Sequence, residues 1–198
     1  MRRNRELLLY KKGYKAIVGL DEVGRGALAG PIVAGACILP RDVSRSLLVQ
    51  LNDSKKLSKT NRELVSKNIT NVAIWSVGVV GNYEIDRLGI AKANILAFKR
   101  ALKNLPNYDY VLVDYFQNID IHHVPVIGVT KGDALVPTIA AASIVAKVYR
   151  DALMKRKATE FPEYGFESHV GYGTERHREA IQKYGTTSIH RKSFIKST

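Results

Sequence analysis

Residues 17–31 read IVGLDEVGRGALAGP, and this stretch decides the fold of the chain. Its apolar run over 17–20 predicts a buried strand, which ends in two adjacent carboxylates, Asp21 and Glu22. Acidic side chains seldom lie beside a buried strand unless a partner offsets their charge. The pair, followed by a glycine-rich turn, predicts a divalent-metal site that faces a phosphate. For the two acids alone, the alternative is a strand end with solvated carboxylates.

The turn after the acids contains Gly24, Arg25 and Gly26. Glycines lack a Cβ atom, so they allow the backbone to approach a ligand closely. Arg25 could contact a phosphate, or it could support the turn by hydrogen bonding to carbonyls. The tripeptide is too short to identify a function by itself, so its meaning depends on the rest of the chain.

Two further acids lie where predicted elements begin or end. Asp114 follows an apolar run near the end of a predicted strand at 110–116, and Asp133 precedes a predicted helix. If the first and fourth strands are neighbours, four carboxylates surround one or two hard cations, for which Mg²⁺ and Mn²⁺ are suited. Two such ions about 4 Å apart could activate water and stabilise the leaving oxygen of a phosphodiester. Alternatively, Asp133 is only a helix N-cap, and Asp114 is an ordinary strand-end acid.

The composition indicates one globular domain, residues 1–198, with an anionic partner. The chain has 31 Lys and Arg against 18 Asp and Glu, a formal net charge of +13, which favours nucleic acid or a membrane surface over a merely basic protein. The single cysteine, Cys37, excludes an intramolecular disulfide and a cysteine-based zinc site. We expect a soluble protein, because the apolar runs are too short for a signal-peptide core or a membrane span. We also expect it to be cytoplasmic and monomeric.

Strands and helices alternate in the predicted order of elements, which indicates an α/β domain with a mixed sheet flanked by helices. Strands are predicted at 16–21, 32–39, 72–80, 110–116 and 124–129. Helices are predicted at 5–12, 44–51, 59–68, 90–103, 135–160 and 175–184, with Pro137 in the first turn of the long helix.

Within that long helix, Ser143, Lys147 and Asp151 recur at intervals of four residues and share one polar stripe. One interpretation is a Lys147–Asp151 ion pair on a solvated face. The sharper interpretation is that Ser143 and Lys147 face the metal cluster or a substrate phosphate. The two readings differ in whether the stripe points to the predicted strand ends.

Other candidate contacts lie outside the acids. Lys55 and Lys56, in the turn DSKKLS, could bind a phosphate, although two lysines in a turn are unspecific. Tyr172 lies between two glycines, where its ring could stack on a sugar or a base. The alternative for Tyr172 is an ordinary packed tyrosine.

The five histidines do not form a metal site in this reading. His122 and His123 are adjacent, so on a strand they would point to opposite faces. His169, His177 and His190 lack the spacing of metal ligands. We expect these three to serve packing, phosphate contact or proton transfer.

Several motifs together identify a family resemblance. GLDEVGRGALAGPIVAGACIL, DSKKLS, VLVDYF, KGDALVPTIAAASIVAKVYRD, HVGYGT and HRKSF occur in the order and approximate spacing of type 2 ribonuclease H, ribonuclease HII, and span about residues 17–195. The GRG tripeptide resembles ribonuclease HII rather than ribonuclease HIII, and the HRKSF ending resembles bacterial members. No sliding-clamp motif is identified.

The resemblance implies the ribonuclease H-like fold, with a small helical C-terminal region at about 160–198 that binds substrate. It implies Mg²⁺- or Mn²⁺-dependent cutting of the RNA strand of RNA–DNA hybrids, and of duplex DNA 5′ of a single embedded ribonucleotide. The products would carry a 3′-hydroxyl and a 5′-phosphate. Ribonucleotide excision and RNA primer removal are the implied roles.

The resemblance also assigns residue roles. The family's acidic tetrad falls on Asp21, Glu22, Asp114 and Asp133, of which Asp133 depends more on substrate. All four are thus expected to be catalytic metal ligands, and they match the four acids that the pattern of predicted elements indicates. Many members have glycine after the third acid, whereas this chain has Tyr115, which affects the predicted shape of that loop.

By the same resemblance, the backbone of residues 24–26 reads the ribonucleotide 2′-hydroxyl, the group that distinguishes RNA from DNA. Tyr172 corresponds to the family tyrosine that stacks on the sugar at the junction. Two other classes compete with this reading. A different metal nuclease of the same fold would cut without a ribonucleotide, and a binding protein without catalysis would leave four acids near a phosphate unexplained.

Overall fold

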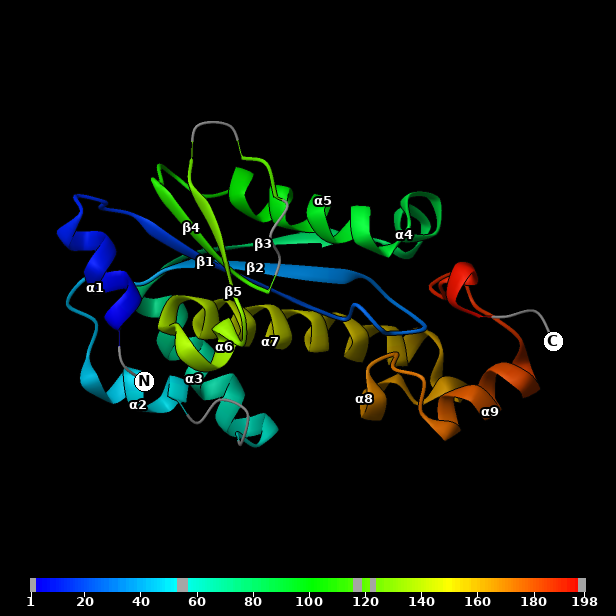
Figure 1. Ribbon diagram of the computed structural model, residues 1–198. Helices are drawn as coiled ribbons and strands as arrows, with labels where there is room; N and C mark the ends of the chain where they lie inside the picture. The colour runs from blue at the N-terminus through cyan, green and yellow to red at the C-terminus, as the bar shows by residue number, and fades with distance from the viewer. Residues whose placement is uncertain (1–2, 53–56, 116–118, 122–123, 196–198) are drawn as a thin grey trace.

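The computed structural model describes residues 3–52, 57–115, 119–121 and 124–195. It confirms the predicted α/β class, with one mixed five-stranded sheet between helices (Figure 1). The strand order is β3-β2-β1-β4-β5. The strands are β1 (Ile17–Val23), β2 (Ile32–Ile38), β3 (Ile74–Val80), β4 (Tyr110–Asp114) and β5 (Val126–Val129).

The central strand β1 sets the position of the acids. It runs antiparallel to β2, to which the turn at 24–31 connects it, and parallel to β4. In the parallel ladder Leu20 lies opposite Val113, so the next residues, Asp21 and Asp114, follow on neighbouring strands about 5 Å apart. The expectation that the first and fourth strands are neighbours is therefore confirmed.

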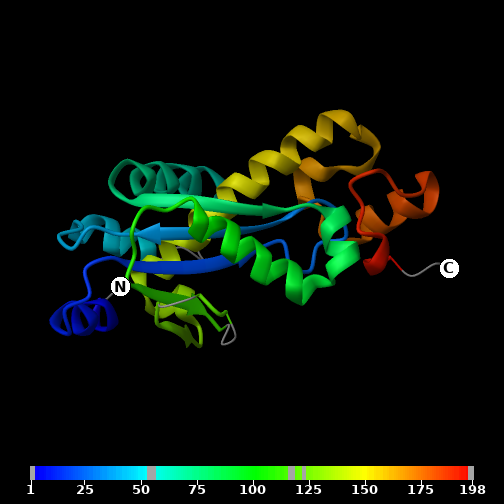
Figure 2. The same cartoon turned by 90° about the horizontal axis from the view of Figure 1, so that it is seen from above.

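Two long helices cover the two faces of the sheet, α5 (Ile90–Lys103) on one side and α7 (Pro137–Glu160) on the other (Figures 1 and 2). Leu20 packs in the buried cluster that contains Phe98 of α5. Gly19 faces α7, and a Cβ atom there would lie 2.1 Å from the carbonyl carbon of Thr138. The alternation of side chains along β1 thus directs successive residues toward α5 and α7 in turn.

The remaining elements surround this core. Cys37 is fully buried in the cluster between the sheet and α7, as expected for a small core residue. No helix in the described part of the chain is long and apolar enough to cross a membrane. The other helices are α1 (Asn4–Lys11), α2 (Arg45–Asn52), α3 (Lys59–Val72), α4 (Asn82–Leu88), α6 (Gly132–Leu135), α8 (Phe166–His169) and α9 (Glu175–Tyr184), with short 3₁₀ turns η2 (Pro162–Tyr164) and η3 (Lys192–Phe194).

Several predicted boundaries differ from the structure. Helix α4 was not predicted, and α3 continues to Val72, so β3 begins two residues later than expected. The predicted helix at 135–160 is two helices, because α6 ends at Leu135 and α7 begins at Pro137. Strand β4 ends at Asp114 because Tyr115 has a φ of 57°, in the left-handed region.

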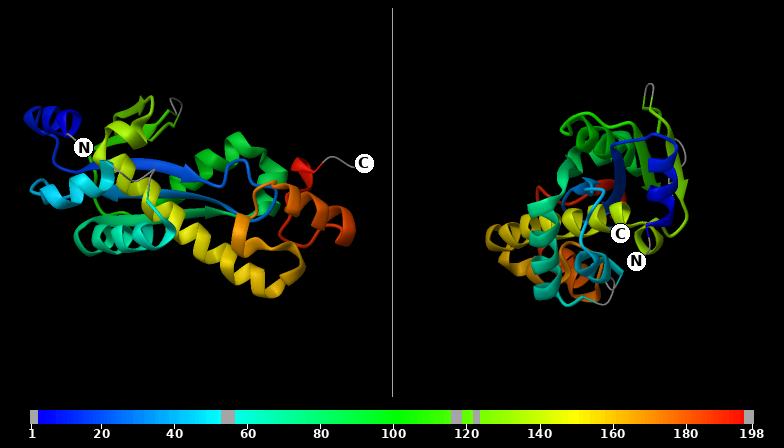
Figure 3. Two further views of the ribbon diagram at one scale, coloured as in Figure 1. Left: turned by 90° about the horizontal axis from the view of Figure 1, so that it is seen from below. Right: turned by 90° about the vertical axis from the view of Figure 1, so that its left-hand side faces the viewer.

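The C-terminal elements pack beside the far end of α7 (Figure 3). Their shared core contains Met154 of α7 together with Tyr164, Phe166 and Ala180. Two isolated bridges connect this region to the β1–β2 turn, Ala27 with Tyr172 and Ala29 with His190. The described part of the C-terminal region, residues 160–195, therefore lies against the turn that follows the acids.

Candidate active site

Asp21 lies on the face of β1 that is covered by α7. Its side chain is only 8% exposed. Burial is the largest cause that raises the pKa of Asp21 to about 8. The negative charges of Glu22 and Asp114 contribute to this rise, whereas a hydrogen bond with Ser143 of α7 opposes it. The structure therefore brings Ser143 to the acids, as the sharper interpretation of the polar stripe expected.

Glu22 points to the other face of the sheet, toward α5. Burial raises the pKa of Glu22, while the nearby amide of Asn94 on α5 and the charge of Arg25 lower it. The Arg25 guanidinium is 3.8 Å from the Glu22 carboxylate. Asn94 is fully buried, and sequence analysis did not single it out, because one amide in an apolar helix carries no motif.

The third acid, Asp114, accepts a hydrogen bond from the Gly132 amide at 2.7 Å. This bond holds α6 against the end of β4. Asp133 directly follows Gly132, so it lies near Asp114 in the chain's fold, and it is half-buried in the first turn of α6. The N-cap of α6 is Lys131, so the reading of Asp133 as a helix N-cap is wrong.

The donor set has the chemistry that a hard divalent cation requires. The charges of Glu22 and Asp114 raise the pKa of Asp21, and the charge of Asp114 raises the pKa of Glu22. A cation would relieve that repulsion. Among the residues that the structure describes, no three His, Cys, Asp or Glu side chains are gathered tightly enough to hold a metal ion. Asp21 and Glu22 point to opposite faces of β1, so we predict that their side chains shift when a cation binds.

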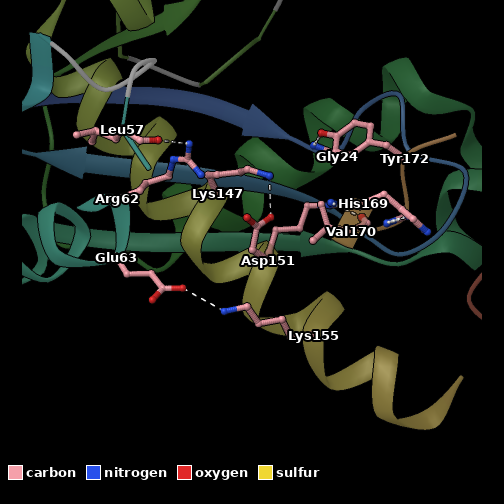
Figure 4. Close-up of polar contacts among 12 residues, drawn as sticks. Gly24, Leu57, Arg62, Glu63, Lys147, Asp151, Lys155, His169, Val170 and Tyr172 are labelled. Atoms are coloured by element: carbon pink, nitrogen blue, oxygen red, sulfur yellow. Dashed lines mark hydrogen bonds and ion pairs between the residues drawn. The ribbon is translucent and has the colours of Figure 1, made fainter. Parts of the chain in front are cut away.

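The turn after the acids is tightly constrained at Gly24. This residue has a φ of 87°, and a Cβ atom there would lie 2.1 Å from Nε of Arg150, so only glycine fits. Its amide donates a hydrogen bond to the Tyr172 hydroxyl at 3.2 Å (Figure 4). Gly26, in contrast, has no atom within 4 Å of where a Cβ would lie.

Two buried arginines hold the turn, and sequence analysis missed both. Arg191 donates to the carbonyls of Gly24 and Arg25 at 2.7 and 2.9 Å. Arg150 of α7 donates to the carbonyls of Ala29 and Pro31 at 3.2 and 2.9 Å. The role considered for Arg25, bonding the turn carbonyls, is thus performed by Arg191 and Arg150. The signal for Arg191 is its place in HRKSF.

Tyr172 is half-buried rather than fully exposed or fully packed. The Arg150 guanidinium lies 5.3 Å from the centre of its ring, and the Lys147 ammonium lies 6.0 Å from it. The positive charges of both side chains are attracted to the electron-rich face of the ring. The structure therefore joins Tyr172, Gly24 and Lys147 in one place beyond the end of β1.

Lys147 also forms the ion pair that the alternative interpretation predicted. Its ammonium is 2.8 Å from the Asp151 carboxylate on the next turn of α7 (Figure 4). The ion pair of the first interpretation is therefore present, and a contact of Lys147 with a substrate phosphate stays a prediction. Lys55, Lys56, His122 and His123 lie outside the described residues.

Comparisons with known proteins agree with this geometry. The sequence model of the ribonuclease HII family matches residues 18–197. Ribonuclease HII of Clostridioides difficile (strain 630) is 47% identical over 194 residues, which are 95% of this chain and 73% of the relative.

Two solved structures share the fold. The PCNA:RNase HII complex from Archaeoglobus fulgidus matches with a TM-score of 0.77 and 24% identity, and covers 93% of this chain and 97% of that chain. Bst-RNase HIII in complex with Mn²⁺ matches with a TM-score of 0.73 and 20% identity, and covers 94% of this chain and 69% of that chain. At these identities the likeness concerns the fold alone.

Proposed function

The chain belongs to the ribonuclease HII family, and from that premise we propose how it selects and cuts its substrate. Family membership makes it an endonuclease that hydrolyses RNA paired with DNA. We propose that it also cuts duplex DNA 5′ of a single embedded ribonucleotide, leaving a 3′-hydroxyl and a 5′-phosphate. Such cutting would serve ribonucleotide excision and RNA primer removal.

One observation supports this proposal most strongly. The Gly24 amide that bonds the Tyr172 hydroxyl lies only two residues after Glu22, so the proposed sugar-reading group and the carboxylates adjoin each other. A sugar held between Tyr172 and the backbone of 24–26 would place its neighbouring phosphate toward the acids. Recognition of the 2′-hydroxyl would then align the phosphodiester that is cut.

The proposed metal ligands are Asp21, Glu22, Asp114 and Asp133, with Mg²⁺ or Mn²⁺ as the cation. Two bound cations would supply activation of water and stabilisation of the leaving 3′-oxygen. The chain's own residues prepare that arrangement. Ser143 hydrogen bonds to Asp21, and the Gly132 amide fixes the Asp114 carboxylate, so two of the acids are oriented by neighbours in α7 and α6.

The surrounding cations have a separate role in this proposal. Lys147 lies beside Tyr172 and beside Asp151, where it would contact a phosphate next to the sugar. The net charge of +13 would add affinity that does not depend on sequence and that weakens with salt. Binding and selection would thus come from different groups.

The test uses labelled duplex DNA that contains one ribonucleotide, with an all-DNA duplex as the control, each with Mg²⁺, with Mn²⁺ and with chelator. Metal-dependent cutting 5′ of the ribonucleotide, with the control intact, is the expected result. Cutting of both duplexes would indicate a general nuclease. Binding without cutting under both metals would contradict the assignment of the four acids.

Two substitutions separate the enzyme from a protein that only binds nucleic acid. Asp21→Asn and Asp114→Asn should each abolish cutting, because each removes a proposed metal ligand. Affinity for the duplex in chelator should be retained or increased, since one negative charge near the phosphates is lost. A variant that still cuts at the rate of the wild type would exclude that acid from the metal site.

A further inference from the structure

Three histidines outside the acid cluster form a buried group next to Tyr172. His169, His177 and His190 are between 0 and 8% exposed. The rings of His169 and His177 stack with centroids 4.6 Å apart. His177 and His190 approach through their Nε2 atoms at 3.1 Å. Buried imidazoles in contact require a defined proton arrangement, because each nitrogen must find a partner of the opposite kind.

The partners of His190 fix its proton on one nitrogen. Its Nδ1 accepts a hydrogen bond from the Thr187 amide at 2.9 Å. Nδ1 is therefore unprotonated, and in the neutral ring the proton lies on Nε2, which faces His177. His190 thus donates to Nε2 of His177.

The proton of His177 follows from this assignment. Because its Nε2 accepts from His190, its proton lies on Nδ1, which is 2.9 Å from the carbonyl of Tyr172. His177 therefore donates to the backbone of Tyr172. Burial lowers the pKa of both His177 and His190, so both rings are neutral at pH 7. The result is one directional chain from Thr187 through two histidines to Tyr172.

The residue after His190 reaches the other part of the proposed sugar-reading site. Arg191 is fully buried and donates to the carbonyls of Gly24, Arg25 and Gly30 at 2.7 to 2.9 Å. Its amide donates to the Leu28 carbonyl at 2.8 Å. One dipeptide of the C-terminal segment therefore holds Tyr172 through His177, and holds the turn directly.

We propose that His190 and Arg191 are positioning residues that set the spacing between the Tyr172 ring and the backbone of residues 24–26, and thereby set how strongly the enzyme prefers a ribose to a deoxyribose. The proposal rests on the proposed function, in which these two groups read the sugar. The hydrogen bond between the Gly24 amide and the Tyr172 hydroxyl joins the two held parts.

A packing role alone would make a different prediction. Packing against Tyr164 and Phe166, whose ring centroids lie 5.1 and 5.9 Å from that of His190, requires only a flat ring of similar size. The hydrogen-bonded chain requires a donor at the position of Nε2. Phenylalanine at position 190 satisfies the first requirement, whereas glutamine can supply a donor near Nε2 and satisfies the second.

The test compares His190→Phe with His190→Gln on a duplex with one ribonucleotide. For His190→Phe we expect kcat to fall about tenfold, the effect of one lost hydrogen bond of ordinary strength, with KM within about twofold because phosphate contacts are unchanged. His190→Gln should restore kcat to within about threefold of the wild type. Wild-type kcat in His190→Phe, or a raised KM with unchanged kcat, would overturn the proposal.

A second measurement does not depend on activity or on the folding of a variant. ¹⁵N NMR of the wild-type imidazoles should show His190 protonated on Nε2 and His177 protonated on Nδ1. The reverse assignment for either ring would overturn the chain. Failure of the proposed function is distinguishable, because a wild-type enzyme that cuts ribose and deoxyribose duplexes alike would contradict the sugar reading even with the predicted protons in place.

Discussion

Replacing Asp21 with asparagine should stabilise the metal-depleted protein while abolishing its activity. Asp21 is 8% exposed, and burial raises its pKa from 3.8 to about 8. In the unfolded chain the carboxyl loses its proton near pH 4, whereas in the folded chain it keeps the proton to about pH 8. Folding is therefore penalised increasingly as the pH rises between these values. Asparagine removes that penalty because it does not ionise.

The size of the effect follows from the difference in pKa. At about 1.4 kcal/mol per pKa unit, holding the carboxyl protonated at pH 7 costs up to about 4 kcal/mol. Structural relaxation and water penetration reduce such penalties, so we expect the free energy of unfolding to rise by about 2–4 kcal/mol. For a chain of this length that corresponds to about 5–15 °C in Tm.

The assay is thermal and urea unfolding in EDTA at pH 4, 5.5 and 7. The stabilisation by Asp21→Asn should be smallest at pH 4, where the carboxyl is protonated in the folded state and only partly ionised in the unfolded state. It should grow toward pH 7. Asp42→Asn, at an exposed position of the same chain, is the matched control and should show no such trend. A stabilisation that is absent at pH 7, or that does not change with pH, would refute the reasoning.

Metal addition extends the same experiment. A cation that binds the folded state raises stability by mass action, so Mg²⁺ should raise the Tm of the wild type more than that of Asp21→Asn. The variant should therefore be the more stable protein in EDTA and the one that responds less to metal. Equal responses of the two proteins would show that Asp21 contributes little to cation binding.

Three further predictions concern the turn, the loop after the third acid and the histidines. Gly24→Ala should lower the free energy of unfolding by about 2 kcal/mol or more, because a Cβ atom would collide with Arg150 and the φ of Gly24 is 87°. Gly26→Ala is the control and should change the free energy of unfolding by no more than about 0.5 kcal/mol. Urea unfolding of the two variants checks this, and equal losses would contradict it. Tyr115→Gly should raise Tm by the equivalent of about 1 kcal/mol, because Tyr115 has a φ of 57°, which favours glycine, and its side chain is 71% exposed. A lower Tm of the variant in calorimetry would contradict backbone strain at Tyr115. Burial lowers the pKa of His190 from 6.5 to about 4. The neutral ring should therefore contribute about 3 kcal/mol to the free energy of unfolding above pH 6.5, and this contribution should be lost as the pH falls to 4. If His190→Gln unfolds in acid along the same curve as the wild type, His190 is not the cause of the acid sensitivity.

Sequence alone determined the fold class and the positions of the acids along the chain. The apolar run of β1 and the β-branched run of β4 specify strands by local composition. A charged residue directly after such a run is expected near a strand end, which is how Asp21 and Asp114 could be found. The predicted end of the first strand at residue 21 was wrong by two residues, because β1 continues to Val23. These features depend on short-range pattern, and so a single sequence is sufficient to show them.

Only the tertiary structure decided which groups meet. The register that pairs Leu20 with Val113 brings Asp21 beside Asp114, and the alternation of β1 places Glu22 toward α5 rather than α7. The rule that adjacent residues on a strand point to opposite faces applies to Asp21 and Glu22.

The same holds for the residues that sequence analysis missed. Arg150 and Arg191 are buried because their donors bond carbonyls of the β1–β2 turn, whose residues lie more than one hundred positions away in the chain. A backbone carbonyl is present at every residue, so nothing in the sequence marks which ones a guanidinium will meet. The pattern of side chains determines where strands and helices form, whereas packing between distant segments determines which donors and acceptors become partners.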